Sequence, residues 1–188
     1  MNPPLLSLLE KLVGILDREQ IPYLVMGGIA VRFWGLPRPT YDLDLTLSIP
    51  PGQVPAFCRR LEAEGFTVPE VHARGFVDTL AGMRKIGVLH HDGTREIRVD
   101  LFLVTTPYQE AAFGRRLRKR LDGMEAWIPT PEDLILHKLI AGRDRDLADI
   151  SDVLVLNPDV DRTYLEKWAQ ALGAADLLAR KLRESDAG

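Results

Sequence analysis

Apolar side chains recur along this chain with two periods, one of about 3.6 residues and one of two residues. The period of 3.6 residues is typical of helices with one buried face. It is clearest at residues 5–18, where the apolar positions would form one stripe along a helix. Thr130 followed by Pro131 is typical of a helix start, because threonine caps the first turn and proline fits its first position. The helical spacing predicts further helices at residues 29–34, 54–64, 132–141, 145–156, 162–172 and 174–184.

Short apolar runs and alternating segments predict the strands. Residues 21–26 form an apolar run that ends at Gly27-Gly28, which indicates a buried strand followed by a tight turn. Residues 41–48 alternate, with leucines at every second position and polar residues between them. Two further pairs of strands flank Asp-Gly dipeptides, which favour hairpins: residues 84–90 and 96–104 around a turn at 91–94, and residues 115–121 and 124–128 around 122–123.

The order of these elements defines a fold class. Strands and helices are interleaved up to about residue 130, and the rest of the pattern is helical. The sequence therefore predicts an α/β to α+β fold with a C-terminal helical region. We expect residues 1–130 to form the core and residues 131–188 to pack on it as part of one compact unit.

Composition narrows the class of protein. The chain has 188 residues, 46% of them hydrophobic, which is enough for one globular core without disulfides. Its single cysteine, Cys58, cannot form an internal disulfide and has no zinc-binding spacing with the four histidines, which we take as structural or surface residues. One thiol favours a reducing, cytoplasmic setting. The first residues lack the features of a signal peptide, and no apolar stretch approaches the roughly 20 residues that span a bilayer, so we expect no membrane partner.

Charge gives one further indication. The net charge of −3 is not typical of a nucleic-acid-binding protein. A local exception is the basic segment 115–120, in which Arg116, Arg118 and Arg120 would share one face of a strand. Two interpretations stay open, a solvated hairpin and a surface that contacts an RNA backbone.

Three aspartates form the candidate chemical centre. Asp42 and Asp44 project from the same face of one predicted strand, and Asp100 lies on another. Paired carboxylates suit Mg²⁺ or Mn²⁺ and leave coordination positions for phosphate oxygens. In a two-metal nucleotidyl transfer site, one ion activates the attacking hydroxyl and the other neutralises the triphosphate and its leaving group. The alternative is that Asp42 and Asp44 form the solvent face of an edge strand, although aspartate is depleted in strands.

The residues before the aspartates add context. Gly27-Gly28 lies between a predicted strand and a short helix, where backbone amides can receive phosphate oxygens. The segment lacks both the lysine of a P-loop and the spaced glycines of a dinucleotide-binding turn. Arg38 and Thr40 lead into the aspartate strand, and an arginine there can either pair with a phosphate or hold the loop onto an aspartate.

Together these residues resemble a known family. The segment from Gly27-Gly28 through Ala30-Val31 and Gly35 to Asp42-Leu43-Asp44 resembles motif I of the polymerase-beta-type nucleotidyltransferases. The sequence motif Arg-x-Thr-x-Asp-Leu-Asp within it is similar to that of the AbiEii/MenT group of toxin nucleotidyltransferases. Asp100 matches the third carboxylate of the family. The downstream lysine and aspartate motifs of that group resemble Pro131-Glu132-Asp133-Leu134, Lys138, Ala141, Arg143 and Arg145-Asp146-Leu147-Ala148-Asp149. The resemblance covers about residues 20–150 in the right order.

The resemblance implies a fold and an activity. The fold would be a mixed sheet with flanking helices. The activity would be transfer of a nucleoside monophosphate from an NTP to an acceptor hydroxyl, with release of pyrophosphate. Asp42, Asp44 and Asp100 would hold the metal ions, and Asp100 would also help to deprotonate the hydroxyl.

The resemblance also implies a nucleotide site that includes Gly27, Gly28, Arg38, Thr40 and Lys138. Lys138 would approach the phosphates, and Asp146 or Asp149 would complete the site. In a continuous helix, Lys138 and Asp149 would lie about 20° apart and Asp146 about 80° from Lys138, although Gly142 is a candidate interruption.

Three classes of function stay open for this chain. The first is a toxin that adds nucleotides to tRNA or another RNA and is opposed by an antitoxin. The second is a small-molecule nucleotidyltransferase of the antibiotic-modifying kind, and the third is a non-catalytic nucleotide-binding module on the same scaffold. Many members of the wider superfamily place serine where this chain has Gly28, a difference that bears on the acceptor more than on the chemistry.

Overall fold

A mixed β-sheet lies at the centre of the fold. The computed structural model describes residues 3–74, 78–80, 83–93 and 95–187. In this part of the chain, six strands form the sheet in the order β1-β2-β6-β5-β3, with β4 also paired to β5. β2 and β6 run parallel and the other neighbours antiparallel, so the expected mixed sheet is confirmed. The strands are β1 (Tyr23–Val25), β2 (Leu43–Leu47), β3 (Phe66–Thr67), β4 (Asp78–Leu80), β5 (Met83–His91) and β6 (Glu96–Leu103).

Both predicted hairpins form. β5 pairs with β6, and Thr94 of their predicted turn lies outside the described residues. β7 (Leu117–Leu121) and β8 (Met124–Ile128) pair separately from the main sheet. They are joined by Asp122 and Gly123, whose φ angles are 45° and 103°. Positive φ at both positions is what the favoured two-residue hairpin turn requires, and the Asp-Gly pair meets that requirement with little strain.

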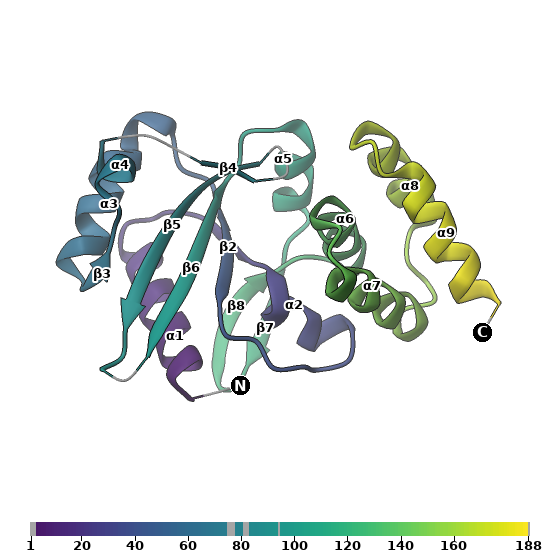
Figure 1. Ribbon diagram of the computed structural model, residues 1–188, viewed down its shortest axis with the longest axis horizontal. Helices are drawn as coiled ribbons and strands as arrows, with labels where there is room; N and C mark the ends of the chain where they lie inside the picture. Colours follow the sequence, from purple (N-terminus) through teal and green to yellow (C-terminus); the bar gives the residue numbers. More distant parts are fainter. Residues whose placement is uncertain (1–2, 75–77, 81–82, 94, 188) are drawn as a thin grey trace.

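Three helices cover parts of the main sheet. α1 (Pro3–Arg18) runs behind the strands in Figure 1, and its buried leucines pack against Leu45 and Leu101 in one hydrophobic cluster. A 3-10 turn at Pro51–Gln53 leads into α3 (Val54–Ala63), whose Cys58 is buried in the same cluster. The short helix α4 (Glu70–Ala73) follows β3. These contacts explain the helical stripes of the first 64 residues.

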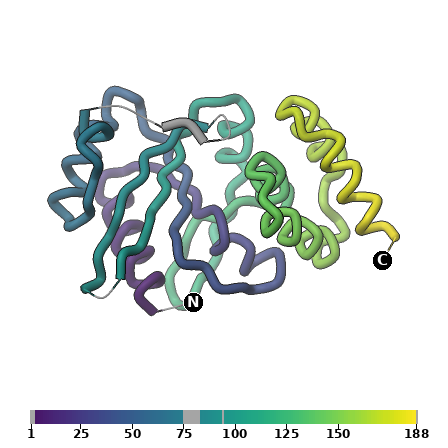
Figure 2. The backbone as a smooth tube through the Cα atoms, in the orientation of Figure 1, coloured from purple at the N-terminus to yellow at the C-terminus, as the bar shows by residue number. Residues whose placement is uncertain are grey.

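The C-terminal helices form a second hydrophobic cluster to one side of the sheet (Figures 1 and 2). The cluster also contains Val31 and Tyr108, which come from two helices earlier in the chain. The region before residue 131 therefore shares a core with the helices that follow it. The helices of this cluster are α2 (Gly27–Trp34), α5 (Pro107–Gly114), α6 (Pro131–Ala141), α7 (Asp144–Leu156), α8 (Arg162–Ala171) and α9 (Ala175–Asp186). Across the described ranges, none of the helices is long and apolar enough to cross a membrane.

Two helix boundaries differ from the sequence prediction. α2 begins at Gly27, so the two glycines form its first turn instead of a loop before it. Gly142 ends α6 in a left-handed conformation with φ of 62°, and α7 begins at Asp144, so the continuous helix assumed for the phase of Lys138 is wrong. β3, β4 and α4 are missing from the sequence prediction because each is too short to show a periodic pattern. α5 is missing because its apolar residues do not follow one helical stripe.

The basic segment that follows α5 is partly used inside the protein. The guanidinium of Arg116 stacks 4.3 Å from the ring centre of Phe113 and donates a hydrogen bond to the Phe113 carbonyl at 2.8 Å. Arg118 pairs with Glu125 at 2.7 Å on the next strand. The face expected for Arg116, Arg118 and Arg120 is therefore not a continuous stripe of free cations, because a ring and an acid engage two of its members.

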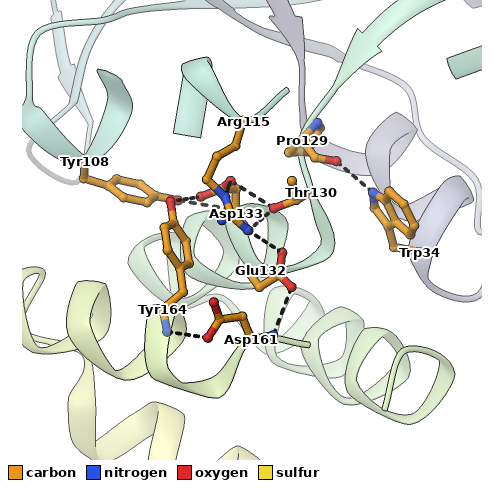
Figure 3. Close-up of polar contacts among 9 residues, drawn as sticks. All are labelled: Trp34, Tyr108, Arg115, Pro129, Thr130, Glu132, Asp133, Asp161 and Tyr164. Atoms are coloured by element: carbon orange, nitrogen blue, oxygen red, sulfur yellow. Dashed lines mark hydrogen bonds and ion pairs between the residues drawn. The ribbon is translucent and has the colours of Figure 1, made fainter. Parts of the chain in front are cut away.

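A buried polar cluster joins α5, α6 and α8 (Figure 3). Asp133 is fully buried, and its Oδ1 accepts a hydrogen bond from the Tyr164 hydroxyl at 2.7 Å. Its Oδ2 accepts hydrogen bonds from Oγ1 of Thr130 at 2.9 Å and from Nε of Arg115 at 3.3 Å. The Tyr108 hydroxyl donates to the backbone carbonyl of Asp133 at 3.1 Å. Because both carboxylate oxygens are satisfied, the cluster holds the C-terminal helices to the preceding elements.

Tyr164→Phe is expected to lower the free energy of unfolding by about 1.5–3 kcal/mol, because it removes a donor from a buried carboxylate. Denaturant unfolding measures this change. The matched control is Tyr41→Phe, whose side chain is 70% exposed and whose effect should stay within about 0.5 kcal/mol. Equal stability of the two variants would contradict the role given to Tyr164.

Candidate active site

The pairing of β2 with β6 places two of the predicted aspartates side by side. Asp44 lies directly opposite Asp100 in the parallel register. Asp42 lies just before β2 and accepts a hydrogen bond from Oγ1 of Thr40 at 2.9 Å. All three aspartates line one cavity of about 390 Å³, which we call the active-site cavity. The edge-strand interpretation is wrong for Asp44, because β2 lies between β1 and β6.

Around Asp44, negative charge is concentrated on one side of the active-site cavity. Burial raises the pKa of Asp44 to about 6, with further contributions from the charges of Asp42 and Asp100. A group in this position gains from a nearby cation, which would offset the repulsion among the carboxylates. The cavity therefore favours a positively charged ligand next to Asp44.

Both glycines at the start of α2 are required by close packing. A Cβ atom at Gly27, where φ is 61°, would lie 1.9 Å from Oδ2 of Asp44. A Cβ atom at Gly28 would lie 2.7 Å from Oγ1 of Thr40. The space that a serine side chain would need at position 28 is therefore filled by Thr40, which explains why this chain has glycine there. Gly27, Gly28 and Asp44 line the same cavity.

Gly28→Ala is expected to destabilise the protein by about 1–3 kcal/mol, because the added methyl group overpacks against Thr40. Thermal unfolding measures the change. Gly52→Ala is the matched control, since a Cβ atom there has nothing within 4 Å and should change stability by no more than about 1 kcal/mol. A Tm for Gly28→Ala equal to that of the wild type would show that the loop yields to the methyl group.

Lys138 projects from α6 into the active-site cavity and is held there by acids of α7. Its Nζ lies 2.7 Å from Oδ1 of Asp146 and 2.7 Å from Oδ2 of Asp149. Nε and Nη2 of Arg38 donate to the two oxygens of Asp149, each at 2.7 Å. Nε of Arg143 donates to Oδ2 of Asp146 at 2.8 Å. Both aspartates therefore position cations, and of the two roles open for Arg38 the structure shows the one that holds the loop onto an aspartate.

These ion pairs keep Asp146 and Asp149 charged. Burial alone would raise the pKa of Asp149, but hydrogen bonds from Arg38 and Lys138 lower it overall. Burial is likewise opposed at Asp146, where Lys138 and then Arg143 lower the pKa of the carboxyl. Both carboxylates are ionised at neutral pH as a result. They can hold Lys138 in place while its charge faces the cavity.

Two cations that the sequence pattern did not single out bind Asp100. Nζ of Lys85 lies 2.9 Å and Nε of Arg98 lies 3.1 Å from its Oδ1. Lys85 is buried in β5, on the same face as Gly87, which pairs with Asp100 across the strands. A buried lysine on the face of β5 opposite the core residues Ile86 and Val88 was the available signal. It could be interpreted only once the register of β5 and β6 was known.

His137 is a further residue of the active-site cavity, whereas the sequence interpretation treated it as structural or surface. Burial lowers its pKa to about 4, and the charge of Lys138 acts in the same direction. Its ring meets the ring of Phe102 edge-on, with centres 5.6 Å apart. The imidazole is therefore neutral at pH 7 and forms, with Phe102, an aromatic part of the cavity wall.

The donor set of this site suits a hard divalent cation. Asp42 and Asp44 offer carboxylate oxygens, the ligands that Mg²⁺ and Mn²⁺ prefer. Among the described residues, no three His, Cys, Asp or Glu side chains are grouped to hold a metal ion by themselves, and Oδ1 of Asp100 is bound by Lys85 and Arg98. Two carboxylates completed by nucleotide phosphate oxygens and water fit Mg²⁺, which usually keeps such ligands.

The fold is that of nucleotidyltransferases. An antigenic nucleotidyltransferase-like protein from Paracoccidioides brasiliensis is 18% identical, with a TM-score of 0.53 over 92% of this chain and 88% of that chain. The antibiotic-resistance factor ANT(2″)-Ia is 14% identical, with a TM-score of 0.55 over 88% and 95%. The lincosamide antibiotic adenylyltransferase LnuA is 12% identical, with a TM-score of 0.50 over 81% and 96%. At these identities the likeness establishes the fold.

The family follows from the sequence itself. The model of a family described as "Nucleotidyltransferase of unknown function (DUF6036)" matches residues 4–180. This chain belongs to that family of nucleotidyltransferases, so the expected enzyme class is confirmed. No curated protein matches the sequence. The closer similarity to the AbiEii/MenT group stays a prediction.

Proposed function

We propose that this protein transfers a nucleoside monophosphate from an NTP to the hydroxyl of an acceptor, in a reaction that depends on Mg²⁺ or Mn²⁺. The observation that carries the proposal is the register of Asp44 opposite Asp100, beside Asp42, in a cavity that Lys138 also lines. Charge of both signs meets in this cavity. The carboxylates would bind the metal ion and accept the proton of the acceptor hydroxyl, and the lysine would bind the phosphates.

The three aspartates have different roles in this proposal. Asp42 and Asp44 would hold the divalent ion, which when bound would neutralise the triphosphate and orient it for attack. Oδ2 of Asp100 has no hydrogen bond among those of the described residues, while Lys85 and Arg98 hold Oδ1. Oδ2 is thus the oxygen of Asp100 that can accept the proton of the acceptor hydroxyl.

The remaining residues bind and position the nucleotide. Lys138 would contact the phosphates, and the backbone amides of Gly27 and Gly28, at the first turn of α2, would donate hydrogen bonds to them. Asp146 and Asp149 are positioning residues, because they contact Lys138. Arg38 and Thr40 position the loop before β2: Arg38 donates hydrogen bonds to Asp149, and Thr40 donates one to Asp42.

For the acceptor we propose a small molecule. Two of the similar solved structures are those of a lincosamide antibiotic adenylyltransferase and of an antibiotic-resistance factor bound to adenylyl-2″-tobramycin. Their folds support the same kind of acceptor here, without identifying it. The basic segment gives RNA less support than its sequence suggests, because Arg116 and Arg118 are engaged by Phe113 and Glu125.

RNA is the second candidate acceptor, with tRNA as the specific case and an antitoxin as a further partner. The observation that favours RNA is the sequence motif of residues 38–44, Arg-x-Thr-x-Asp-Leu-Asp, which is similar to that of the AbiEii/MenT toxin nucleotidyltransferases. Transfer of label to total tRNA would favour RNA over a small acceptor.

The test incubates the full chain with Mg²⁺ and each of the four labelled NTPs, in one arm with total tRNA and in another with a panel of hydroxyl-bearing antibiotics. We expect transfer of label to a small acceptor, its loss when EDTA removes the metal, and its return with added Mg²⁺ or Mn²⁺. Calorimetry measures binding of the NTP with Mg²⁺ independently of the acceptor. Absence of this binding, together with absence of transfer in every arm, would overturn the proposal.

A further inference from the structure

A second cavity, of about 480 Å³, lies between α5, α6 and α8, which meet near the top of Figure 1. Its walls are largely apolar and aromatic, and we call it the apolar cavity. They include Tyr108 of α5, Ile140 of α6 and Trp168 of α8, with Leu172 just after α8. The proposed chemistry makes no use of this cavity.

The apolar cavity adjoins the active-site cavity. Met83 at the start of β5 lines both of them. The last turns of α6 separate them, since His137, Lys138 and Ala141 line the active-site cavity and Ile140 lines the apolar cavity. Met83 is thus a wall that the two cavities share.

The strands determine which part of the active site the apolar cavity adjoins. Asp100 and Phe102 lie on one face of β6, and both line the active-site cavity. At about 3.3 Å per residue, the end of β6 at Leu103 lies about 10 Å beyond Asp100. Thr106 and Pro107, which follow that end, line the apolar cavity. The apolar cavity is thus reached from Asp100 along β6, whereas the glycine turn follows β1, two strands away in the sheet.

The chemistry of the apolar cavity selects its ligand. None of its described lining residues carries a charge, so it suits neither a polycation nor the phosphates of RNA. The hydroxyl of Tyr108 is already bonded to the backbone of Asp133. The indole Nε1 of Trp168 is itself buried, so Trp168 offers a ligand the surface of its ring and not its donor. Tyr108 and Trp168 place their rings 5.5 Å apart, which offers aromatic contact to a flat or cyclic ligand.

We propose that the apolar cavity binds the ring system of the acceptor, an uncharged cyclic molecule whose hydroxyl reaches Asp100 past Met83. This inference rests on the proposed function, and it narrows the small-molecule acceptor to one that carries both an apolar ring system and the reacting hydroxyl. The nucleotide base is the other conceivable occupant. It is disfavoured because the cavity adjoins the Asp100 end of the site and not the glycine turn.

The test measures binding of N-phenyl-1-naphthylamine, an uncharged fluorescent aromatic compound, to the full chain. The variant is Ala171→Trp: Ala171 lines the apolar cavity but is exposed, so a tryptophan can fill the cavity without disturbing the core. Gln170→Trp, at the neighbouring exposed position of α8, is the matched control. We expect saturable binding to the wild type, weakened at least about tenfold by Ala171→Trp and within about twofold by Gln170→Trp. Thermal unfolding confirms that each variant is folded.

Three results would overturn the proposal: no binding to the wild type, equal binding to Ala171→Trp, or displacement of the probe by ATP with Mg²⁺. Displacement would assign the cavity to the nucleotide base. Probe binding does not require catalysis, so it should persist in Asp44→Asn. If the probe binds but neither NTP binding nor transfer is found, the proposed function fails, and the acceptor role of the apolar cavity fails with it. If NTP binding and transfer are found but the probe does not bind, only the proposal for the apolar cavity fails.

Discussion

Replacing Asp44 by asparagine is expected to lower the rate of nucleotidyl transfer by about 1000-fold or more. Asparagine keeps the shape of the side chain, so the packing of Asp44 against Gly27 is retained. It removes the negative charge that would hold the divalent ion beside Asp42. The measurement is label transfer at saturating NTP and Mg²⁺.

The matched control for this substitution is Asp159→Asn. Asp159 is exposed and lies after α7, so transfer should stay within about twofold of the wild-type rate. If Asp44→Asn kept more than about a tenth of the wild-type rate, Asp44 could not be a ligand of an essential ion.

The same substitution should change how stability depends on pH in metal-free buffer. The folded-state pKa of Asp44 is raised from 3.8 to about 6, so the folded protein binds more protons than the unfolded chain between these values. The wild type therefore loses stability from this group as pH rises from about 4 to about 6. Asp44→Asn avoids the loss and should be more stable than the wild type at pH 8, by up to about 3 kcal/mol, and equal to it below pH 4.

Lys138→Met is expected to lower the free energy of unfolding by about 3–5 kcal/mol at pH 7, because it leaves two buried carboxylates without a shared partner. Asp146 and Asp149 each lie 2.7 Å from Nζ of Lys138, and both are buried. Arg38 and Arg143 stay paired with them and keep the loss within this range. Denaturant unfolding measures the change, and calorimetry with NTP and Mg²⁺ should show weaker binding.

The pH dependence of Lys138→Met distinguishes lost charge pairing from lost packing. The folded-state pKa values of Asp146 and Asp149 are lowered, so the stability from these pairs is present above the unfolded pKa and is lost as pH falls. The gap between the wild type and Lys138→Met should therefore shrink as pH falls below about 4. Arg180→Met is the control: Arg180 and its partner Glu184 have side chains that are 56% and 50% exposed, so its effect should be below about 1 kcal/mol. A gap for Lys138→Met that did not change with pH would indicate lost packing.

The local pattern of the chain was enough to predict the elements and the acid pair. The alternation of Leu43, Leu45 and Leu47 indicated the strand that carries Asp44, and these leucines are all buried. The Asp122-Gly123 pair indicated a hairpin that forms with two positive φ angles. Such signals are readable because side-chain alternation and turn conformation depend on residues close in sequence.

The sequence pattern also determined the order of the motifs, and this order supported the enzyme class. The glycine turn, the acid pair, a third acid on a second strand and a later lysine resemble the nucleotidyltransferase pattern, and the family match confirms the class. Position 28 shows the limit of this inference. Thr40 fills the space that a serine side chain at position 28 would need, and only the packing of the two residues shows this. The sequence pattern does not, because Gly28 and Thr40 belong to different segments.

Only the tertiary structure decided which charges meet. Lys85 reaches Asp100 because β5 and β6 pair in one particular register, and the pattern of either strand alone would allow others. Helical phase favoured Asp149 over Asp146 as the partner of Lys138, but the break at Gly142 lets α7 bring both acids to it. Register and helix packing are determined by the burial of side chains that are distant along the chain, and local periodicity carries no record of those contacts.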